Sequence, residues 1–337
     1  MASTLAIAQS NDVTWQEALR GAIRSQVELL TALQLTESED TAAAREQFSI
    51  RVPRDYLRRM VPGDPNDPLL LQVLASADEM VVTEGFSPDP LEELTSNPIS
   101  GLVHKYADRA LIMPTAACAV HCRYCFRRHF PYQDNRLDET ALTRIIDYLA
   151  SHQELNEIIL SGGDPLVVED DYLGLLIDRL ATIPHLKRIR VHSRVPVVIP
   201  QRLTESLATV LSGTRLEPVL VIHCNHPQEL DPPTQWQFKN WSHYGIPTLN
   251  QSVLLQGIND DVEILSALSE RLWSSGVHPY YLHILDAVQG AQQYAITLER
   301  AVALHQQLQA RLSGYLVPAL VQEIAGQPHK VRLSSGR

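Results

Sequence analysis

Three cysteines close together in the sequence carry the clearest chemical signal of the chain. Cys118, Cys122 and Cys125 are spaced C-x₃-C-x₂-C. Thiolates are soft ligands that bind iron–sulfur clusters or zinc, and such short spacings allow one loop to wrap around one metal centre. Three thiolates leave one position of a four-ligand site open, which suits a catalytic centre better than a structural one. The pattern therefore predicts a reactive metal loop.

The residues around these cysteines argue against an ordinary buried segment. A free cysteine is often no more than a small buried hydrophobe, but this loop also contains Arg123, Arg127 and Arg128. Such basic side chains do not suit core packing and need an explanation of their own. The fourth cysteine, Cys224, ends an apolar run far along the chain, so burial explains it better than a role as fourth ligand.

Other candidate residues occur where short apolar runs end. The run at 157–160 is followed by Ser161, Gly162, Gly163 and Asp164. The paired glycines allow a close backbone approach, and the serine and aspartate can bind an amino or hydroxyl group. On its own such a sequence more often means a plain turn. Polar side chains also lie near the ends of the next three runs, at Arg194, His223 and Gln251.

Two acidic residues and a lysine complete the candidates. Asp286 stands next to an apolar stretch, where a carboxylate must find a partner or face a cavity; it either receives a substrate ammonium or caps a helix. Glu323 and Lys330 follow the last apolar run. A lysine near a C-terminus is usually solvated, whereas a cofactor-binding lysine reacts as a neutral amine, favoured by partial burial or nearby cations.

The second part of the chain predicts a scaffold that brings strand ends together. Amphipathic helical patterns separate its apolar runs, for example the stripe of Leu142, Ile145, Ile146 and Leu149. Repeated strand–helix units predict a parallel sheet covered by helices, and six units with a final strand favour a partial or complete barrel, whose active site lies where strands end. The runs are at 110–113, 157–160, 188–192, 219–223, 248–253, 280–283 and 316–321.

Before the barrel, residues 1–100 are predicted to form a helical region, leaving 101–337 for the barrel. Thr14-Trp-Gln-Glu17 is a capping-box sequence that predicts a helix through the low 30s. A further helix is expected at 69–77, and prolines mark 84–97 as an irregular linker. This region shows no obvious chemistry.

Composition is that of a soluble globular protein, with 337 residues, 45% hydrophobic and 20% charged. The net charge of −11 disfavours nucleic-acid binding. No apolar run approaches the roughly 20 residues of a membrane span, and the N-terminus lacks a signal-peptide pattern. Crowded thiolate ligands suit a reducing compartment. These features predict a cytoplasmic protein without a membrane or nucleic-acid partner.

The cysteine spacing, followed at once by Arg127 and Arg128, resembles the lysine 2,3-aminomutase family of radical S-adenosylmethionine (SAM) enzymes. The resemblance implies an α/β fold, a partial (βα)6-type TIM barrel with an N-terminal helical extension. It also implies a [4Fe–4S] cluster, SAM and pyridoxal 5′-phosphate (PLP). Glu323 stands where catabolic members have aspartate, and the loop before Lys330 lacks their four-glycine run. These departures favour the short branch that makes (R)-β-lysine for elongation factor P.

The resemblance further implies a role for each candidate residue. The cluster ligands are Cys118, Cys122 and Cys125. The SAM neighbours are Ser161, Gly162, Gly163, Asp164, Arg194, His223 and Gln251. Lys330 is catalytic and holds PLP as a Schiff base, and Arg109 binds the PLP phosphate. The substrate contacts are Arg127, for the carboxylate, and Asp286 with Glu323, for the ε-ammonium.

The implied reaction moves the α-amino group of free L-lysine to the β-carbon. Its implied partners are a flavodoxin- or ferredoxin-type electron donor and, functionally, elongation factor P with its lysyl ligase. One alternative is an aminomutase acting on glutamate, but Asp286 and Glu323 would repel the side-chain carboxylate of that substrate. The other is a non-catalytic iron–sulfur or zinc module, which needs a fourth ligand and gives no reason for Lys330.

Overall fold

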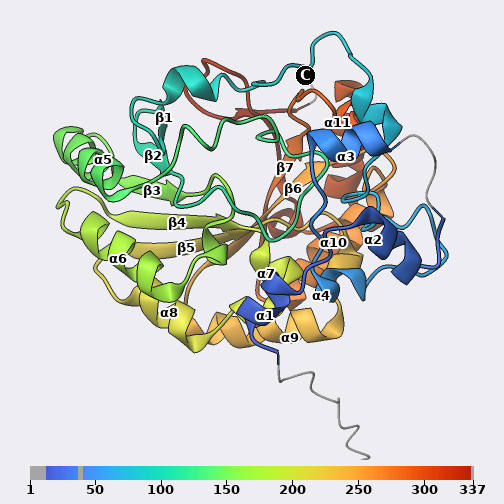
Figure 1. Ribbon diagram of the computed structural model, residues 1–337, viewed down its shortest axis with the longest axis horizontal. Helices are drawn as coiled ribbons and strands as arrows, with labels where there is room; N and C mark the ends of the chain where they lie inside the picture. The colour runs from blue at the N-terminus through green and yellow to red at the C-terminus, as the bar shows by residue number, and fades with distance from the viewer. Residues whose placement is uncertain (1–12, 37–40, 335–337) are drawn as a thin grey trace, which may run out of the picture.

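A nine-stranded sheet, ordered from β1 to β9, forms the centre of the computed structural model, which describes residues 13–36 and 41–334 (Figure 1). Strands β2 to β8 run parallel, and β1 and β9 are antiparallel at the two edges. The strands are β1 Leu102–Tyr106, β2 Arg109–Ile112, β3 Glu157–Leu160, β4 Arg188–Ser193, β5 Glu217–Ile222, β6 Thr248–Leu254, β7 His278–Ile284, β8 Ala319–Gln322 and β9 Val331–Arg332.

A long helix follows each strand from β2 to β7, which gives six strand–helix units and a final parallel strand. The predicted partial barrel is therefore confirmed. The stripe of the first of these helices buries Leu142, Ile145 and Leu149 against the sheet, as its spacing indicates. The helices are α5 Glu139–Ser151, α6 Asp170–Ala181, α8 Glu205–Ser212, α9 Pro232–Trp241, α10 Val262–Ser274 and α11 Leu298–Arg311, with a short α7 Val195–Val198 after β4.

The N-terminal region is built from short helices rather than the two longer ones expected. Thr14 and Glu17 form the predicted capping box, but the helix ends at Arg20 because Ile23 pairs with Val52 as an isolated β-bridge. The elements are α1 Trp15–Arg20, α2 Gln26–Ala32, α3 Ala42–Gln47, α4 Arg54–Leu57 and the 3₁₀ turns η1 Ala77–Met80 and η2 Glu93–Ser96.

The expected helix at 69–77 is wrong, because residues 69–74 form turns. The buried carboxylate of Asp67 accepts hydrogen bonds from the backbone N–H groups of Leu69 and Leu70. The carbonyl of Gln72 accepts the N–H of Arg123 at 2.9 Å instead of a helical partner. Contacts with the cysteine loop therefore override the local helical tendency.

One hydrophobic core joins the N-terminal region to the barrel. Trp15, Ile23 and Val52 belong to the same buried cluster as Ile158 of β3 and Leu220 of β5. The chain enters the sheet at β1, close to the boundary expected at residue 100. The two parts nevertheless pack as one body, so the division into two regions stays a prediction.

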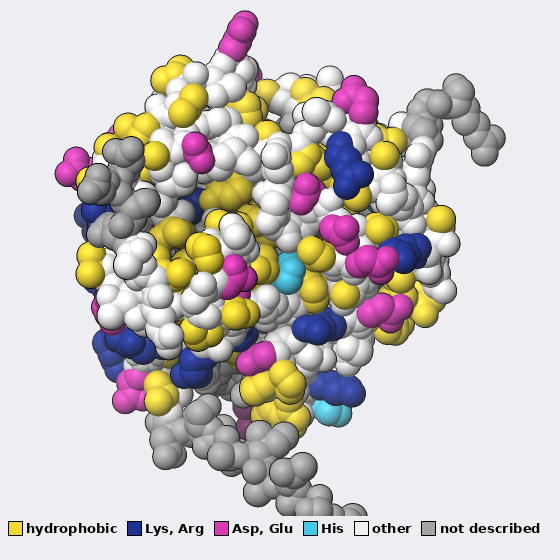
Figure 2. All heavy atoms as spheres, turned by 90° about the vertical axis from the view of Figure 1, so that its right-hand side faces the viewer, with side chains coloured by type: hydrophobic (Ala, Val, Ile, Leu, Met, Phe, Trp, Pro, Cys, Tyr) yellow, Lys and Arg dark blue, Asp and Glu magenta, His cyan; other side chains and the backbone are white. Residues whose placement is uncertain are grey.

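The surface shows no single-sign field on the face drawn in Figure 2, where acidic, basic and apolar side chains alternate across the described residues. Within 13–36 and 41–334 no helix combines the length and apolar character needed to cross a membrane. Residues 1–12, in which the sequence lacks a signal-peptide pattern, lie outside the described part of the chain.

Candidate active site

A cavity of about 870 Å³ opens at the carboxyl ends of the parallel strands. The structure brings every predicted site residue to its wall, so sequence segments more than two hundred residues apart meet there. The predicted residues that line it are Arg109, Cys118, Cys122, Cys125, Arg127, Ser161, Gly162, Gly163, Asp164, Arg194, His223, Gln251, Asp286, Glu323 and Lys330. This placement is common to all of them; their individual roles stay predictions.

The cysteine loop is held against the turn that follows β3. The N–H of Gly163 donates to the carbonyl of Thr115 at 3.0 Å, and the N–H of Asp164 donates to that of Ala117 at 2.8 Å. A Cβ atom at Gly163 would lie 2.5 Å from the Ala117 oxygen. The glycine is thus required for the backbone approach that fixes the chain just before Cys118.

Two of the three thiols, those of Cys118 and Cys125, lie in an environment that disfavours their charged forms. Burial raises the pKa of Cys118 well above its usual value, and the neighbouring thiols raise it further. Burial, followed by the proximity of Cys122, raises the pKa of Cys125 to about 11. A bound metal centre supplies the positive charge that turns such thiols into thiolates.

The donor set is that of an iron–sulfur cluster. Cys118, Cys122 and Cys125 line one cavity, and cysteine thiolates are the protein ligands of such clusters. Arg194 adds a donor to the site, because its Nη1 lies 2.7 Å from the Sγ of Cys122. The residues therefore fit a [4Fe–4S] cluster.

Asp164 is committed to internal hydrogen bonds. Its carboxylate accepts from the hydroxyl of Ser193 at 2.6 Å and from the N–H groups of Arg194 and Val195 at 2.7 and 3.1 Å. It also accepts from the N–H of Leu166 at 3.0 Å. In this structure Asp164 ties the end of β3 to the end of β4, and it positions Arg194 rather than offering a free oxygen to the cavity.

Neutral histidines form the deep wall of the cavity. Burial lowers the pKa of His223 well below its usual value, and the nearby cation Arg194 lowers it further. The Nε2 of His223 lies 3.1 Å from the hydroxyl of Tyr124, and Gln251 lies 3.4 Å from the Nδ1 of His192.

Two of these histidines were not among the site residues predicted from the sequence. His192 and His283 line the cavity, and the Nε2 atom of each is buried without a hydrogen-bond partner among the described residues. Each lies within a strand, on β4 and β7. Period-two alternation along those strands is the only signal that could have pointed to them.

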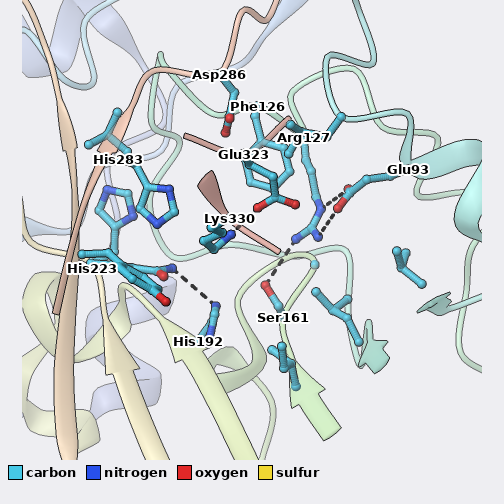
Figure 3. Close-up of a pocket in the computed structure, with 18 of the residues that line it drawn as sticks. Glu93, Phe126, Arg127, Ser161, His192, His223, His283, Asp286, Glu323 and Lys330 are labelled. Atoms are coloured by element: carbon cyan, nitrogen blue, oxygen red, sulfur yellow. Dashed lines mark hydrogen bonds and ion pairs between the residues drawn. The ribbon is translucent and has the colours of Figure 1, made fainter. Parts of the chain in front are cut away.

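Lys330 and the two predicted substrate carboxylates meet at the centre of the cavity (Figure 3). Lys330 forms an ion pair with Glu323, whose second oxygen accepts from the Nζ of Lys105 at 2.8 Å. Burial opposes ionisation of Glu323, but these two lysines outweigh it and hold its pKa well below the usual value. Burial, then the charge of Glu323, raises the pKa of Asp286 to about 7.

Arg109 occupies the same end of the cavity as Lys105. Its Nη1 pairs with Asp108 at 2.7 Å, and its guanidinium lies 4.1 Å from the ring centre of Tyr106. Lys105, Arg109 and Arg332 all line the cavity. Guanidinium groups such as that of Arg109 are well suited to binding phosphate.

The arginines of the cysteine loop are paired with carboxylates from the N-terminal region. Glu79 forms ion pairs with both Arg123 and Arg128, and each Nη2 lies 2.5 Å from a Glu79 carboxylate oxygen. Arg127 donates two hydrogen bonds, of 2.6 and 2.8 Å, to the carboxylate of Glu93. The N-terminal region, whose sequence shows no obvious chemistry, thus supplies the counter-charges of these arginines. The only sequence signal for these partners was the set of arginines around the cysteines, whose charges had no explanation.

Residues 112–212 match the model of the radical SAM superfamily. Fold, cysteine loop and match together define a radical SAM enzyme. The chain is 48% identical to the L-lysine 2,3-aminomutase of Haemophilus influenzae, with 94% of each chain covered. It is 45% identical to that of Escherichia coli over 95% of this chain and 94% of the other. A relative from Buchnera aphidicola is 41% identical over 97% of each chain.

The chain therefore belongs to the lysine 2,3-aminomutase family of radical SAM enzymes. Membership makes it an isomerase that uses a [4Fe–4S] cluster and SAM.

Proposed function

We propose that this protein is a PLP-dependent aminomutase that moves the α-amino group of free L-lysine to the β-carbon and forms (R)-β-lysine. The observation that most directly supports this proposal is the distribution of charge around the cavity. Arg127 lines the cavity together with Asp286 and Glu323, and it takes its counter-charge from Glu93 rather than from either of these two carboxylates (Figure 3). This pattern complements an amino acid with a carboxylate at one end and a cationic side chain at the other.

The Glu323–Lys330 ion pair places the amine of Lys330 beside the carboxylate proposed to bind the side chain of the substrate. A lysine holds PLP through its neutral amine, so binding of PLP would end this ion pair. Glu323 would then be available for the ε-ammonium of lysine, with Asp286 as the second partner.

PLP fits the same end of the cavity. Lys330 supplies the amine and Arg109, with Lys105 nearby, supplies positive charge for a phosphate. PLP provides an imine through which a nitrogen can move between neighbouring carbons, and the cluster with SAM provides a radical that removes an unreactive hydrogen. The chain orients the substrate, excludes water and separates the charges.

The test is anaerobic turnover of the reconstituted enzyme with lysine, SAM, PLP and dithionite. We expect β-lysine from the wild type, and from Lys330→Ala neither product nor the visible absorption of a lysine–PLP imine. Lys239→Ala, at an exposed position on α9, is the matched control and should keep both. Cluster-loaded, PLP-bound wild type that turns over glutamate but not lysine would overturn the proposal.

The product is proposed to serve elongation factor P in the cytoplasm, with electrons supplied by a flavodoxin- or ferredoxin-type protein. Support comes from Glu323 and from the loop before Lys330, which depart from the catabolic pattern. We expect elongation factor P, incubated with its lysyl ligase and the enzyme's product, to gain the mass of one β-lysyl group. Preference of the ligase for unreacted α-lysine over that product would contradict this assignment.

A further inference from the structure

The pairing of Arg127 leaves one edge of its guanidinium for the cavity. Its Nε and Nη2 donate to the two oxygens of Glu93 at 2.6 and 2.8 Å, and both side chains are more than nine-tenths buried. Its Nη1 points the other way and lies 3.2 Å from the hydroxyl of Ser161, which lines the cavity (Figure 3). The ring of Phe126 packs under the guanidinium at 4.7 Å. The orientation of Arg127 is thus fixed from three sides.

Glu93 is itself held in place by an unusual backbone. The carboxylate of Asp89 accepts the N–H groups of Glu93 and Leu94 at 3.0 and 3.2 Å. The preceding residue, Glu92, has a φ of 51°. Within the described residues only one other non-glycine, Gln34, has a positive φ. Such a conformation costs about 1 kcal/mol or more and is retained where the surroundings require it.

We propose that Glu93 is a positioning residue that sets the specificity for the substrate carboxylate. Glu93 accepts hydrogen bonds from Nε and Nη2 of Arg127, which leaves Nη1 facing the cavity beside Ser161. There Nη1 can bind the carboxylate of the substrate. Glu93 also neutralises the arginine while the cavity holds no substrate. The inference rests on the proposed function, in which Arg127 binds the carboxylate of lysine.

A competing model makes Glu93 an inhibitor that occupies Arg127 until lysine displaces it. The two models predict opposite changes. If Glu93 positions Arg127, its loss weakens lysine binding because the guanidinium is no longer aimed. If Glu93 blocks Arg127, its loss tightens lysine binding. The geometry favours positioning because the Glu93 contacts do not use Nη1.

The experiment compares L-lysine with L-lysinamide, which lacks the carboxylate. Binding is followed by the change in PLP absorption, and turnover by product formation, for wild type, Glu93→Gln and Glu93→Asp. We expect Glu93→Gln to weaken lysine binding roughly tenfold, the size expected for losing one charge-assisted hydrogen bond. Lysinamide binding should not change. Glu93→Asp keeps the charge, so its affinity for lysine should lie between those of the wild type and Glu93→Gln.

Glu92→Gln is the control, because Glu92 is exposed and adjacent. Thermal unfolding of each variant shows whether a change is structural. Equal weakening for lysine and lysinamide, unchanged binding of lysine, or tighter binding of lysine by Glu93→Gln would each overturn the role of Glu93. A wild type that binds lysine and lysinamide equally would instead overturn the role of Arg127 in the proposed function, and that of Glu93 with it.

Discussion

Two glutamates of the N-terminal region, Glu79 and Glu93, dock against the same cysteine loop and face opposite environments. Glu79 pairs with Arg123 and Arg128, and all three side chains are at most 1% exposed. Glu93 pairs with Arg127 at the cavity wall, where Ser161 is a neighbour. Adjacent arginines, 127 and 128, therefore point one into the site and one into the body of the protein. The same kind of ion pair thus lies at the cavity wall in one place and within the protein body in the other.

Contacts other than ion pairs also hold Arg123 and Arg128, the two arginines that pair with Glu79. Arg123 and Arg128 both lie 4.9 Å from the ring centre of Phe48, and Arg128 also donates to the carbonyl of Gly290 at 2.6 Å. A buried ion pair is weak evidence of net stabilisation, but removing one partner strands a buried charge. The comparison therefore predicts that losing Glu79 damages the fold and losing Glu93 damages recognition.

The largest expected effect is that of Glu79→Gln. Two buried guanidinium groups would lose their counter-charge, so we expect the free energy of unfolding to fall by about 3–5 kcal/mol. Cluster incorporation should fall with it, since both arginines belong to the loop that carries the cysteines. Urea unfolding and the iron content after reconstitution measure this. Glu84→Gln, at an exposed position nearby, is the control. A Glu79→Gln variant as stable as the wild type would contradict the proposed difference between Glu79 and Glu93.

Arg127→Lys should act mainly on the substrate. A lysine ammonium can pair with Glu93 but cannot present a second, fixed edge to a carboxylate. We expect KM for lysine to rise by roughly ten- to hundredfold, corresponding to about 1.4–2.8 kcal/mol, with less loss of stability than for Glu79→Gln. The matched control is Arg136→Lys, an exposed conservative change. Unchanged KM would group Arg127 with Arg123 and Arg128.

Lysine binding should depend on pH through Asp286. Its pKa is raised to about 7 in the free enzyme, first by burial and then by Glu323. Below this pH the carboxyl is neutral and attracts the ε-ammonium less, whereas the ammonium itself stays charged up to about pH 10. We therefore expect KM for lysine to fall as pH rises through 7 and then to level off. Asp286→Asn should lose this dependence; a variant that keeps it would assign the titration to another group.

The smallest effect is expected at an exposed ion pair of the same region. Arg54 and Glu28 lie 2.6 Å apart, but their side chains are 57% and 46% exposed. Solvent screens such pairs, so Glu28→Gln should change the free energy of unfolding by less than about 1 kcal/mol. Thermal unfolding at two salt concentrations checks this. A loss comparable to that of Glu79→Gln would show that burial does not explain the difference.

The sequence was most informative where local pattern and chemistry coincide. The stripe of Leu142, Ile145 and Leu149 and the runs before Ser161 and Arg194 placed the helices and strands. Parallel strands end at one edge of the sheet, so the residues at those ends had to meet. All of the predicted site residues line one cavity, although Arg109 begins β2 and does not follow a strand.

Residues that act through distant partners could not be found in this way. Glu79 and Glu93 lie in segments without periodicity, and only the fold brings them to Arg123 and Arg127. The turn at 69–74 was read as a helix because its competing hydrogen bond, from Arg123 to Gln72, spans 51 residues. Such non-local contacts leave no trace in a single segment.

The short edge strand β9 has a consequence for the motion of Lys330. The ladder between β8 and β9 consists of two residue pairs, Val321 with Arg332 and Gln322 with Val331. A ladder this short at a sheet edge opens at low free energy, whereas β4 pairs on both sides. We expect the amide protons of β9 to exchange with solvent well before those of β4. Lys330, the lysine proposed to react, directly precedes a strand that is expected to open readily, whereas the three cysteines follow a segment that backbone hydrogen bonds hold to the turn after β3.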